Sequence, residues 1–157
     1  MLASLLHGVE DLRRDEVEEP APGPNEVKLR VSHNGLCGTD LAYFFERGPR
    51  TDGPQPLGHE FSGVITEVGP GVPATRVGEC VCVCALLSCG HCVECRAGLT
   101  NLCLEIGVGG IGCGADRGGL AEYVVVPTEL ALTLPAGLSL ADGALVEPMA
   151  EIGRAHV

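Results

Sequence analysis

The chain has 157 residues, enough for one domain with a hydrophobic core and too few for two domains of ordinary size. Its formal net charge is −11 and Lys28 is its only lysine, which excludes a basic surface for nucleic acid or an anionic membrane. Aromatic residues make up only 3%, whereas 23 glycines and 11 prolines favour many short strands joined by tight turns over a helix bundle.

The sequence shows no targeting signal and no membrane-spanning segment. Its longest apolar run, at residues 81–87, is far shorter than the roughly 20 residues that a spanning helix needs. The chain carries nine cysteines, an odd number. Without a secretion signal, so many thiols indicate a reducing, cytoplasmic setting and metal binding in place of disulfides.

Alternating and β-branched segments predict most of the secondary structure. In residues 26–33, Val27, Leu29 and Val31 fall on one face of a strand. Further strands are predicted at residues 2–7 and 12–17, after Glu60, and at residues 80–84 and 120–127. Short helices are predicted at residues 41–47 and 138–149, and a glycine-rich loop at residues 107–119. This pattern predicts a mainly β fold, either a small barrel or a sandwich.

A cysteine-dense segment at residues 88–104 carries the most specific local pattern. Its spacing is Cys89-x2-Cys92-x2-Cys95-x7-Cys103. Four thiolates so close in sequence can close a tetrahedron around one zinc ion, the usual form of a structural zinc site. Bacterial ferredoxins share the first two spacings, but their motif continues with a three-residue gap and a proline. The pattern favours structural zinc over an iron–sulfur cluster, with free thiols as the remaining alternative.

The other cysteines and histidines give weaker signals. Cys80, Cys82 and Cys84 share one face of a predicted strand, a line that suits packing better than chelation. Cys113 has no partner that the sequence identifies. The histidines interpreted as having no ligand role are His7, His33, His91 and His156.

A second set of possible metal ligands comes from distant parts of the chain. Cys37 follows a predicted strand and turn, and His59 and Glu60 precede an apolar run. A His–Glu pair alone is weak support for a site, with an ordinary polar loop as the alternative. A thiolate, an imidazole and a carboxylate, however, are ligands with which catalytic zinc keeps one position open for substrate. Thr39 adds a hydroxyl nearby, and Glu147 is a further candidate carboxylate.

These motifs follow one another in the order of a known family. The sequence resembles the catalytic domain of zinc-dependent medium-chain dehydrogenases/reductases, the alcohol dehydrogenase superfamily. The resemblance covers residues 1–150 and rests on the GHE-x2-G-x5-G-x2-V pattern at residues 58–72, the CGTD motif at residues 37–40, the four-cysteine segment and Glu147-Pro148. Within the superfamily, the sequence is most similar to the polyol branch, the butanediol and sorbitol dehydrogenases, with threonine dehydrogenases as a near alternative.

The resemblance implies a GroES-like, partly open β-barrel with a structural zinc lobe and a few short helices. It also implies two Zn²⁺ ions per chain. The implied ligands of the catalytic zinc are Cys37, His59 and either Glu60 or Glu147. Asp40 would orient His59 through its second ring nitrogen, and Thr39 would take the alcohol proton. The implied reaction is the reversible oxidation of a secondary alcohol or diol to a ketone with NAD or NADP.

The sequence departs from the family in three places. Many relatives have a histidine five residues after the cysteine ligand, where this chain has Ala42, so proton release would depend on water or be slower. No Rossmann domain follows Pro148, and the glycines at 107–114 lack the strand–turn–helix context of a dinucleotide-binding turn. We therefore expect this chain alone to be inactive. Residues 151–157 can be encoded by the opening bases of a common sequencing adapter, and we expect a non-native tail there, with a natural helix end as the alternative.

Two other classes of protein remain open at this point. One is a zinc-binding β module without catalysis, and the other is a zinc-free reductase relative. The second is disfavoured because both sets of zinc ligands are complete. For the full-length form, the resemblance implies a small-molecule alcohol or ketone substrate, a homo-oligomer, and no nucleic-acid or membrane partner.

Overall fold

The computed structural model of the chain describes residues 1–50, 52–105, 110–114 and 116–154. Across these residues the strands are β1 (Leu2–Gly8), β2 (Asp11–Glu16), β3 (Glu26–Asn34), β4 (Gln55–Pro56), β5 (Phe61–Val68), β6 (Cys80–Val83), β7 (Tyr123–Pro127) and β8 (Ala131–Thr133). The α-helices are α1 (Gly38–Ala42), α2 (Val93–Arg96), α3 (Leu140–Ala144) and α4 (Val146–Arg154). The π and 3₁₀ turns are η1 (Tyr43–Arg47), η2 (Ala74–Arg76), η3 (Thr100–Leu102) and η4 (Thr128–Leu130). None of the described helices has the length and apolar character that crossing a bilayer requires.

The larger sheet has five antiparallel strands in the order β7-β3-β5-β6-β8. β3 and β5 are its centre, and Leu29 pairs with Ile65 across them. Their fully buried side chains form the main core together with residues of β6 and β7. β7 and β8 are the edges of this sheet among the described residues, so the predicted barrel is an open one.

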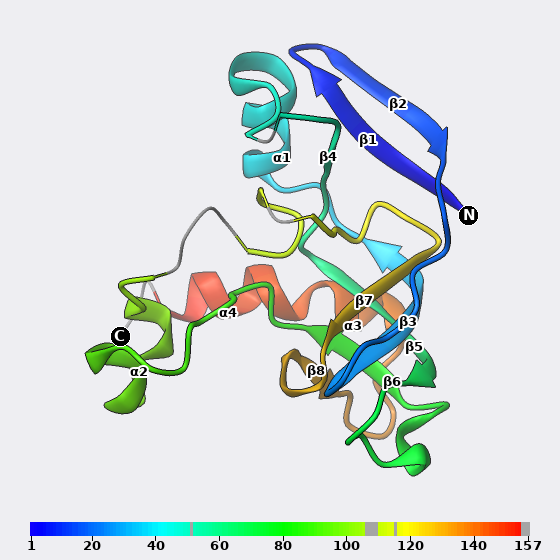
Figure 1. Cartoon of the computed structure of the whole chain (residues 1–157), viewed down its shortest axis with the longest axis vertical. Helices are drawn as coiled ribbons and strands as arrows, with labels where there is room; N and C mark the ends of the chain where they lie inside the picture. Colours follow the sequence, from blue (N-terminus) through cyan, green and yellow to red (C-terminus); the bar gives the residue numbers. More distant parts are fainter. Residues whose placement is uncertain (51, 106–109, 115, 155–157) are drawn as a thin grey trace.

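The smaller sheet has the order β2-β1-β4 and stands at one end of the molecule (Figure 1). β1 and β2 form an antiparallel hairpin, and β4 pairs with the far side of β1. Leu6, Tyr43 and Leu57 make a second, smaller core under this sheet. Because Tyr43 and Leu57 flank the segments of the second predicted metal site, this core holds those segments against the hairpin.

Lys28 is buried in the middle of β3, an outcome that alternation alone does not predict. Its side chain is 6% exposed and its ammonium is 2.7 Å from the Glu19 carboxylate, with the Glu67 carboxylate as a second partner. It also lies 5.5 Å from the centre of the Tyr123 ring. Two carboxylates and an aromatic face therefore replace the water that the only lysine loses.

The predicted helix at residues 138–149 is two helices, α3 and α4, which meet at Leu145. Pro148 explains the break, because it has no N–H to donate to the carbonyl of Ala144, four residues earlier. In the first turn of α4, by contrast, the missing N–H costs nothing. α4 continues past residue 150 to Arg154. The remainder of the predicted tail and part of the predicted loop at 107–119 lie outside the described residues.

The sequence predicted that Cys80, Cys82 and Cys84 share a face of a strand that packs inside the protein. This prediction was wrong for Cys80. Only Cys82 is buried, at 6% exposure, whereas Cys80 is exposed. The core face of β6 is the opposite one, because it carries Val81 and Val83, which are 0% and 2% exposed.

Candidate metal centres

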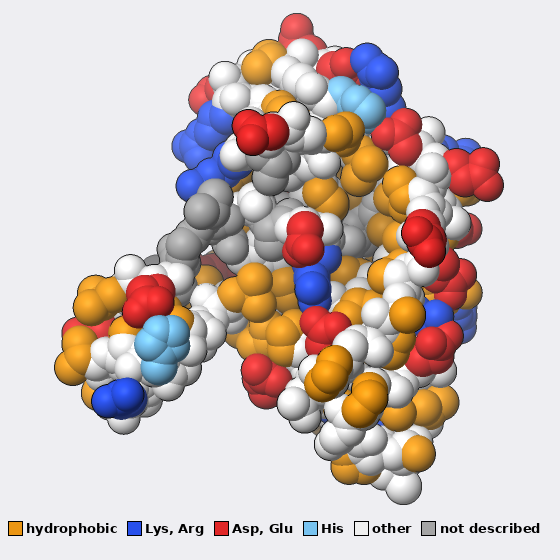
Figure 2. Space-filling view, in the orientation of Figure 1, with side chains coloured by type: hydrophobic (Ala, Val, Ile, Leu, Met, Phe, Trp, Pro, Cys, Tyr) orange, Lys and Arg blue, Asp and Glu red, His pale blue; other side chains and the backbone are white. Residues whose placement is uncertain are grey.

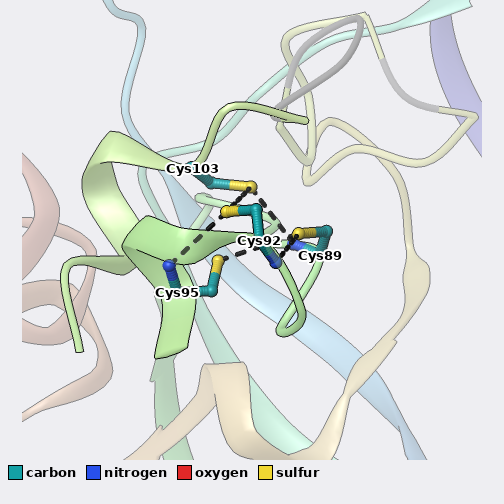
Figure 3. Close-up of side chains that lie close together, drawn as sticks. All are labelled: Cys89, Cys92, Cys95 and Cys103. Atoms are coloured by element: carbon teal, nitrogen blue, oxygen red, sulfur yellow. Dashed lines mark hydrogen bonds between the residues drawn. The ribbon is translucent and has the colours of Figure 1, made fainter. Parts of the chain in front are cut away.

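The four cysteines of the 88–104 segment converge on one point, as Figure 3 shows. The Sγ atoms of Cys89 and Cys95 are 3.9 Å apart, and those of Cys92 and Cys103 are 4.0 Å apart. A zinc ion with four Zn–S bonds of about 2.3 Å requires S–S separations of about 3.8 Å. The four sulfurs are therefore spaced for tetrahedral zinc, and the donor set fits that ion.

Backbone N–H groups favour the thiolate of Cys92 at this centre, whereas burial raises the pKa of the Cys95 thiol to about 12. The N–H of Cys92 donates to the Cys89 sulfur at 3.2 Å, and the N–H of Cys95 donates to the Cys92 sulfur at 3.4 Å. Hydrogen bonds from the N–H groups of Cys95 and Leu104 lower the pKa of the Cys92 thiol to about 6. The backbone turns around these sulfurs at Gly90 and Gly98, whose positive φ angles of 72° and 81° suit glycine.

The lobe that holds these cysteines projects from the two sheets (Figures 1 and 2). Between residues 88 and 105 only Cys103 is buried. The exposed apolar side chains of the lobe are Val93, Leu99, Leu102 and Leu104. His91 is exposed, as expected, and lies 3.1 Å from the Glu105 carboxylate. The lobe therefore has little buried apolar surface to fix its shape.

The second set of predicted ligands also comes together. The ligand atoms of Cys37, His59 and Glu60 lie within 4.8 Å of one another. Cys37 is the N-cap of α1, and the other two residues directly precede β5. His59 is buried at 5% exposure and Glu60 at 9%. A thiolate, an imidazole and a carboxylate in a partly dry setting fit a zinc ion that keeps an open position.

Asp40 ties the two segments of this site together through their backbones. It is 3% exposed, and one oxygen accepts the N–H of Cys37 at 3.0 Å while the other accepts the N–H of Gly58 at 3.2 Å. The Nδ1 atom of His59 is 3.7 Å from the nearer oxygen. Asp40 therefore fixes the spacing of Cys37 and His59, and its direct orientation of the ring stays a prediction.

The remaining predicted residues lie around this group. Thr39 is in α1, two residues after Cys37. Glu147 is in the first turn of α4 and lies outside the set within 4.8 Å. Burial raises the pKa of its carboxyl, the nearby His59 lowers it and Glu60 raises it. Glu147 is thus close enough to His59 and Glu60 to feel their charges, while Glu60 is the carboxylate that the geometry groups with Cys37 and His59.

Cys113 is the residue at this site that sequence reasoning missed. Its Sγ is 3.1 Å from Nδ1 of His59, although the two residues are 54 positions apart. Burial raises the pKa of this thiol to about 12, so it is neutral at pH 7. No spacing pattern joins a lone cysteine to a distant histidine, and only the fold reveals the contact.

The sequence of this chain matches a known protein family. The family described as the alcohol dehydrogenase GroES-like domain matches residues 23–136. The chain belongs to this family. An open, mainly β structure with a cysteine cluster at Cys89–Cys103 that is compatible with a zinc lobe agrees with the fold that the resemblance predicted, and the alcohol dehydrogenase assignment is confirmed.

Two curated relatives of this alcohol dehydrogenase domain illustrate the match. The starvation-sensing protein RspB of Escherichia coli is 38% identical over 148 residues, 94% of this chain and 43% of that protein. The (R,R)-butanediol dehydrogenase of Bacillus subtilis is 40% identical over 163 residues, 96% of this chain and 45% of that enzyme. The chain thus spans less than half the length of the relatives it matches.

Solved structures agree. E. coli RspB in complex with NADH superimposes with a TM-score of 0.86 at 37% identity, over 94% of this chain and 42% of that one. The cobalt- and zinc-bound thermostable alcohol dehydrogenase of Pyrobaculum aerophilum gives a TM-score of 0.84 at 36% identity, over 94% of this chain and 44% of that one. Family members of this fold therefore bind NADH in one case and zinc in another.

Proposed function

We propose that this chain is the zinc-binding catalytic part of an NAD(P)-dependent alcohol or polyol dehydrogenase, which interconverts a secondary alcohol or diol and a ketone. The observation that carries the proposal is the mixed group of Cys37, His59 and Glu60, which is separate from the four-thiolate lobe. A closed set of four thiolates suits a structural ion, whereas a mixed set of three suits an ion that also receives substrate.

In this proposal, Cys37, His59 and Glu60 hold the catalytic zinc, with Glu147 beside them as the competing carboxylate. When bound, zinc supplies a Lewis acid that polarises the substrate oxygen. Asp40 keeps the Cys37 and His59 segments at a fixed spacing. The Thr39 hydroxyl would receive the proton that leaves the alcohol and pass its own proton on to water. NAD or NADP, the hydride acceptor, binds to a part of the protein beyond this chain.

The four-cysteine lobe holds a second, structural zinc in the same proposal, which makes two ions per chain. The small-molecule alcohol or ketone reaches the mixed site. The full-length protein acts as a homo-oligomer in the cytoplasm, where the nine cysteine thiols of this chain stay reduced.

Metal analysis of the chain, purified with zinc present, tests the proposal. We expect two zinc ions per wild-type chain. Cys37→Ala should leave one, because it removes a ligand of the mixed site only. The matched control, Cys92→Ala, should lose the other ion, because it opens the lobe. One zinc in the wild type, or two in Cys37→Ala, would contradict the proposed catalytic site.

A further inference from the structure

Cys113 lies against the mixed site, and the proposed function assigns it no part. It ends a tight turn in which its N–H donates to the carbonyl of Gly110 at 2.9 Å. An isolated β-bridge pairs it with Leu57, two residues before His59. The backbone therefore delivers this side chain to the histidine in a defined register.

The neighbouring glycines allow the two segments to approach this closely. Gly112 has a φ angle of +72°, and a Cβ atom there would overlap the backbone of Gly58. Gly58 has a φ angle of +90°, and a Cβ there would meet Leu120. Both positions require glycine, and a side chain at Gly112 would push the Cys113 turn away from the Gly58–His59 segment.

Hydrogen bonds also hold the Cys113 turn from the side of the smaller core. The buried Tyr43 hydroxyl donates to the Cys113 carbonyl at 3.3 Å, and the Arg50 guanidinium donates to the Tyr43 hydroxyl at 3.2 Å. The N–H of Gly112 donates to the Arg117 carbonyl at 2.7 Å. The sulfur is thus placed by several independent contacts.

Those contacts put the sulfur where a zinc-bound histidine needs a partner. A histidine that binds metal through one ring nitrogen donates the N–H of the other, and this second contact sets the ring orientation. Nδ1 of His59 is 3.1 Å from the Cys113 sulfur and 3.7 Å from the Asp40 carboxylate. The sulfur is within hydrogen-bonding distance and the carboxylate is beyond it. Nε2 is then the nitrogen left to face a metal.

We propose that Cys113 is a positioning residue for the catalytic zinc: its sulfur accepts the Nδ1–H of His59 and holds the ring so that Nε2 points toward Cys37 and Glu60. This inference rests on the proposed function, because it needs zinc at the mixed site. Cys113 itself is not a ligand and takes no part in the transfer of hydride or proton.

Equilibrium competition with a chromophoric zinc chelator tests the inference on the whole chain, and the four-cysteine zinc serves as an internal reference. Cys113→Ala should lower the zinc affinity of the mixed site about tenfold or more, which is the usual effect of removing such a hydrogen-bond partner. Cys113→Ser should remain close to wild type, because its hydroxyl oxygen accepts the same N–H. Cys82→Ala, which removes a buried cysteine from β6, should change neither affinity.

A Cys113→Val variant guards against misfolding of the alanine variant, because valine fills the space but accepts no hydrogen bond. If alanine does not fold, weak zinc binding in the valine variant and tight binding in the serine variant support the inference. Wild-type affinity in the alanine or valine variant would overturn it, as would an equal loss in Cys82→Ala. A wild-type chain whose only zinc is in the lobe would overturn the proposed function and this inference together. Two wild-type zincs with no effect at position 113 would overturn the inference alone.

Discussion

Arg117 shows how single side chains hold the loops of this domain to its sheet. Its guanidinium donates to the Glu26 carboxylate at 2.7 Å and to the carbonyl of Val125 at 3.2 Å. The other oxygen of Glu26 accepts the N–H of Gly23 at 2.9 Å. The hydrogen bond from Arg117 is the main reason that the pKa of the Glu26 carboxyl lies below its ordinary 4.5, with the Gly23 N–H lowering it further.

We expect Arg117→Gln to lower the free energy of unfolding at pH 7 by up to about 1 kcal/mol, since both partners are partly exposed. A lowered carboxyl pKa stabilises the folded state above pH 4.5, and this stabilisation is lost as the pH falls through the folded pKa. Urea unfolding at pH 7 and about pH 3 should therefore show a smaller difference at low pH. Arg30→Gln, at an exposed position of β3, is the control. A difference independent of pH would refute the ion pair's role.

At the scale of elements, α3 matters beyond its five residues because it brings α4 and Glu147 to the mixed site. The Ser62 hydroxyl of β5 donates to the Leu140 carbonyl. A Cβ at Gly143 would be 2.7 Å from Leu134, so the helix packs closely on its neighbours. A helix this short is unstable alone. Its Ser139 N-cap accepts the N–H of Asp142 at 3.1 Å, and the Asp142 carboxylate accepts the N–H of Ser139 at 3.1 Å.

We predict that Ser139→Ala lowers the free energy of unfolding by about 1 kcal/mol, the usual cost of losing an N-cap. Ser139→Thr should retain most of the stability, because threonine also caps. Thermal unfolding followed by circular dichroism measures both variants. Equal destabilisation by alanine and threonine would show that the cap is not the cause.

At the scale of the whole molecule, two parts differ in what stabilises them. The sheets bury two apolar cores, whereas the lobe at residues 88–105 buries only Cys103. Hydrophobic burial therefore stabilises the sheets without metal, whereas the lobe has little buried apolar surface, and we propose that metal ligation supplies its order.

Removal of zinc by a strong chelator should accordingly loosen the lobe first. Hydrogen exchange measured by mass spectrometry should show lost protection at residues 89–103 and retained protection in β3 and β5. Re-addition of zinc should restore the lobe. Uniform loss of protection across the chain would mean that the sheets also depend on the metal.

Much of this architecture was predictable because the signals were local. Alternating residues predicted β3, and thiol spacing predicted the lobe. The family motifs predicted that Cys37 and His59 would meet. Features that depend on distant contacts were not predictable. Lys28 is buried by contacts with Glu19, Glu67 and Tyr123. Cys113 reaches His59 only because a separate turn folds against the His59 segment. The break before α4 had a local cause in Pro148, which the helix prediction passed over.

The enclosure of Lys28 has a practical chemical consequence. It is the only lysine in 157 residues, and its side chain is 6% exposed between two carboxylates. The α-amino group of Met1 donates to the carbonyl of Val17 at 2.8 Å. Amine-acylating reagents therefore find no exposed lysine on the folded chain. Coupling to beads, dyes or cross-linkers through lysine requires β3 to separate from the strands that pair with it. Acylation of this one lysine amine, after it leaves its carboxylate partners and loses a proton to solvent, reports on the opening of the central sheet.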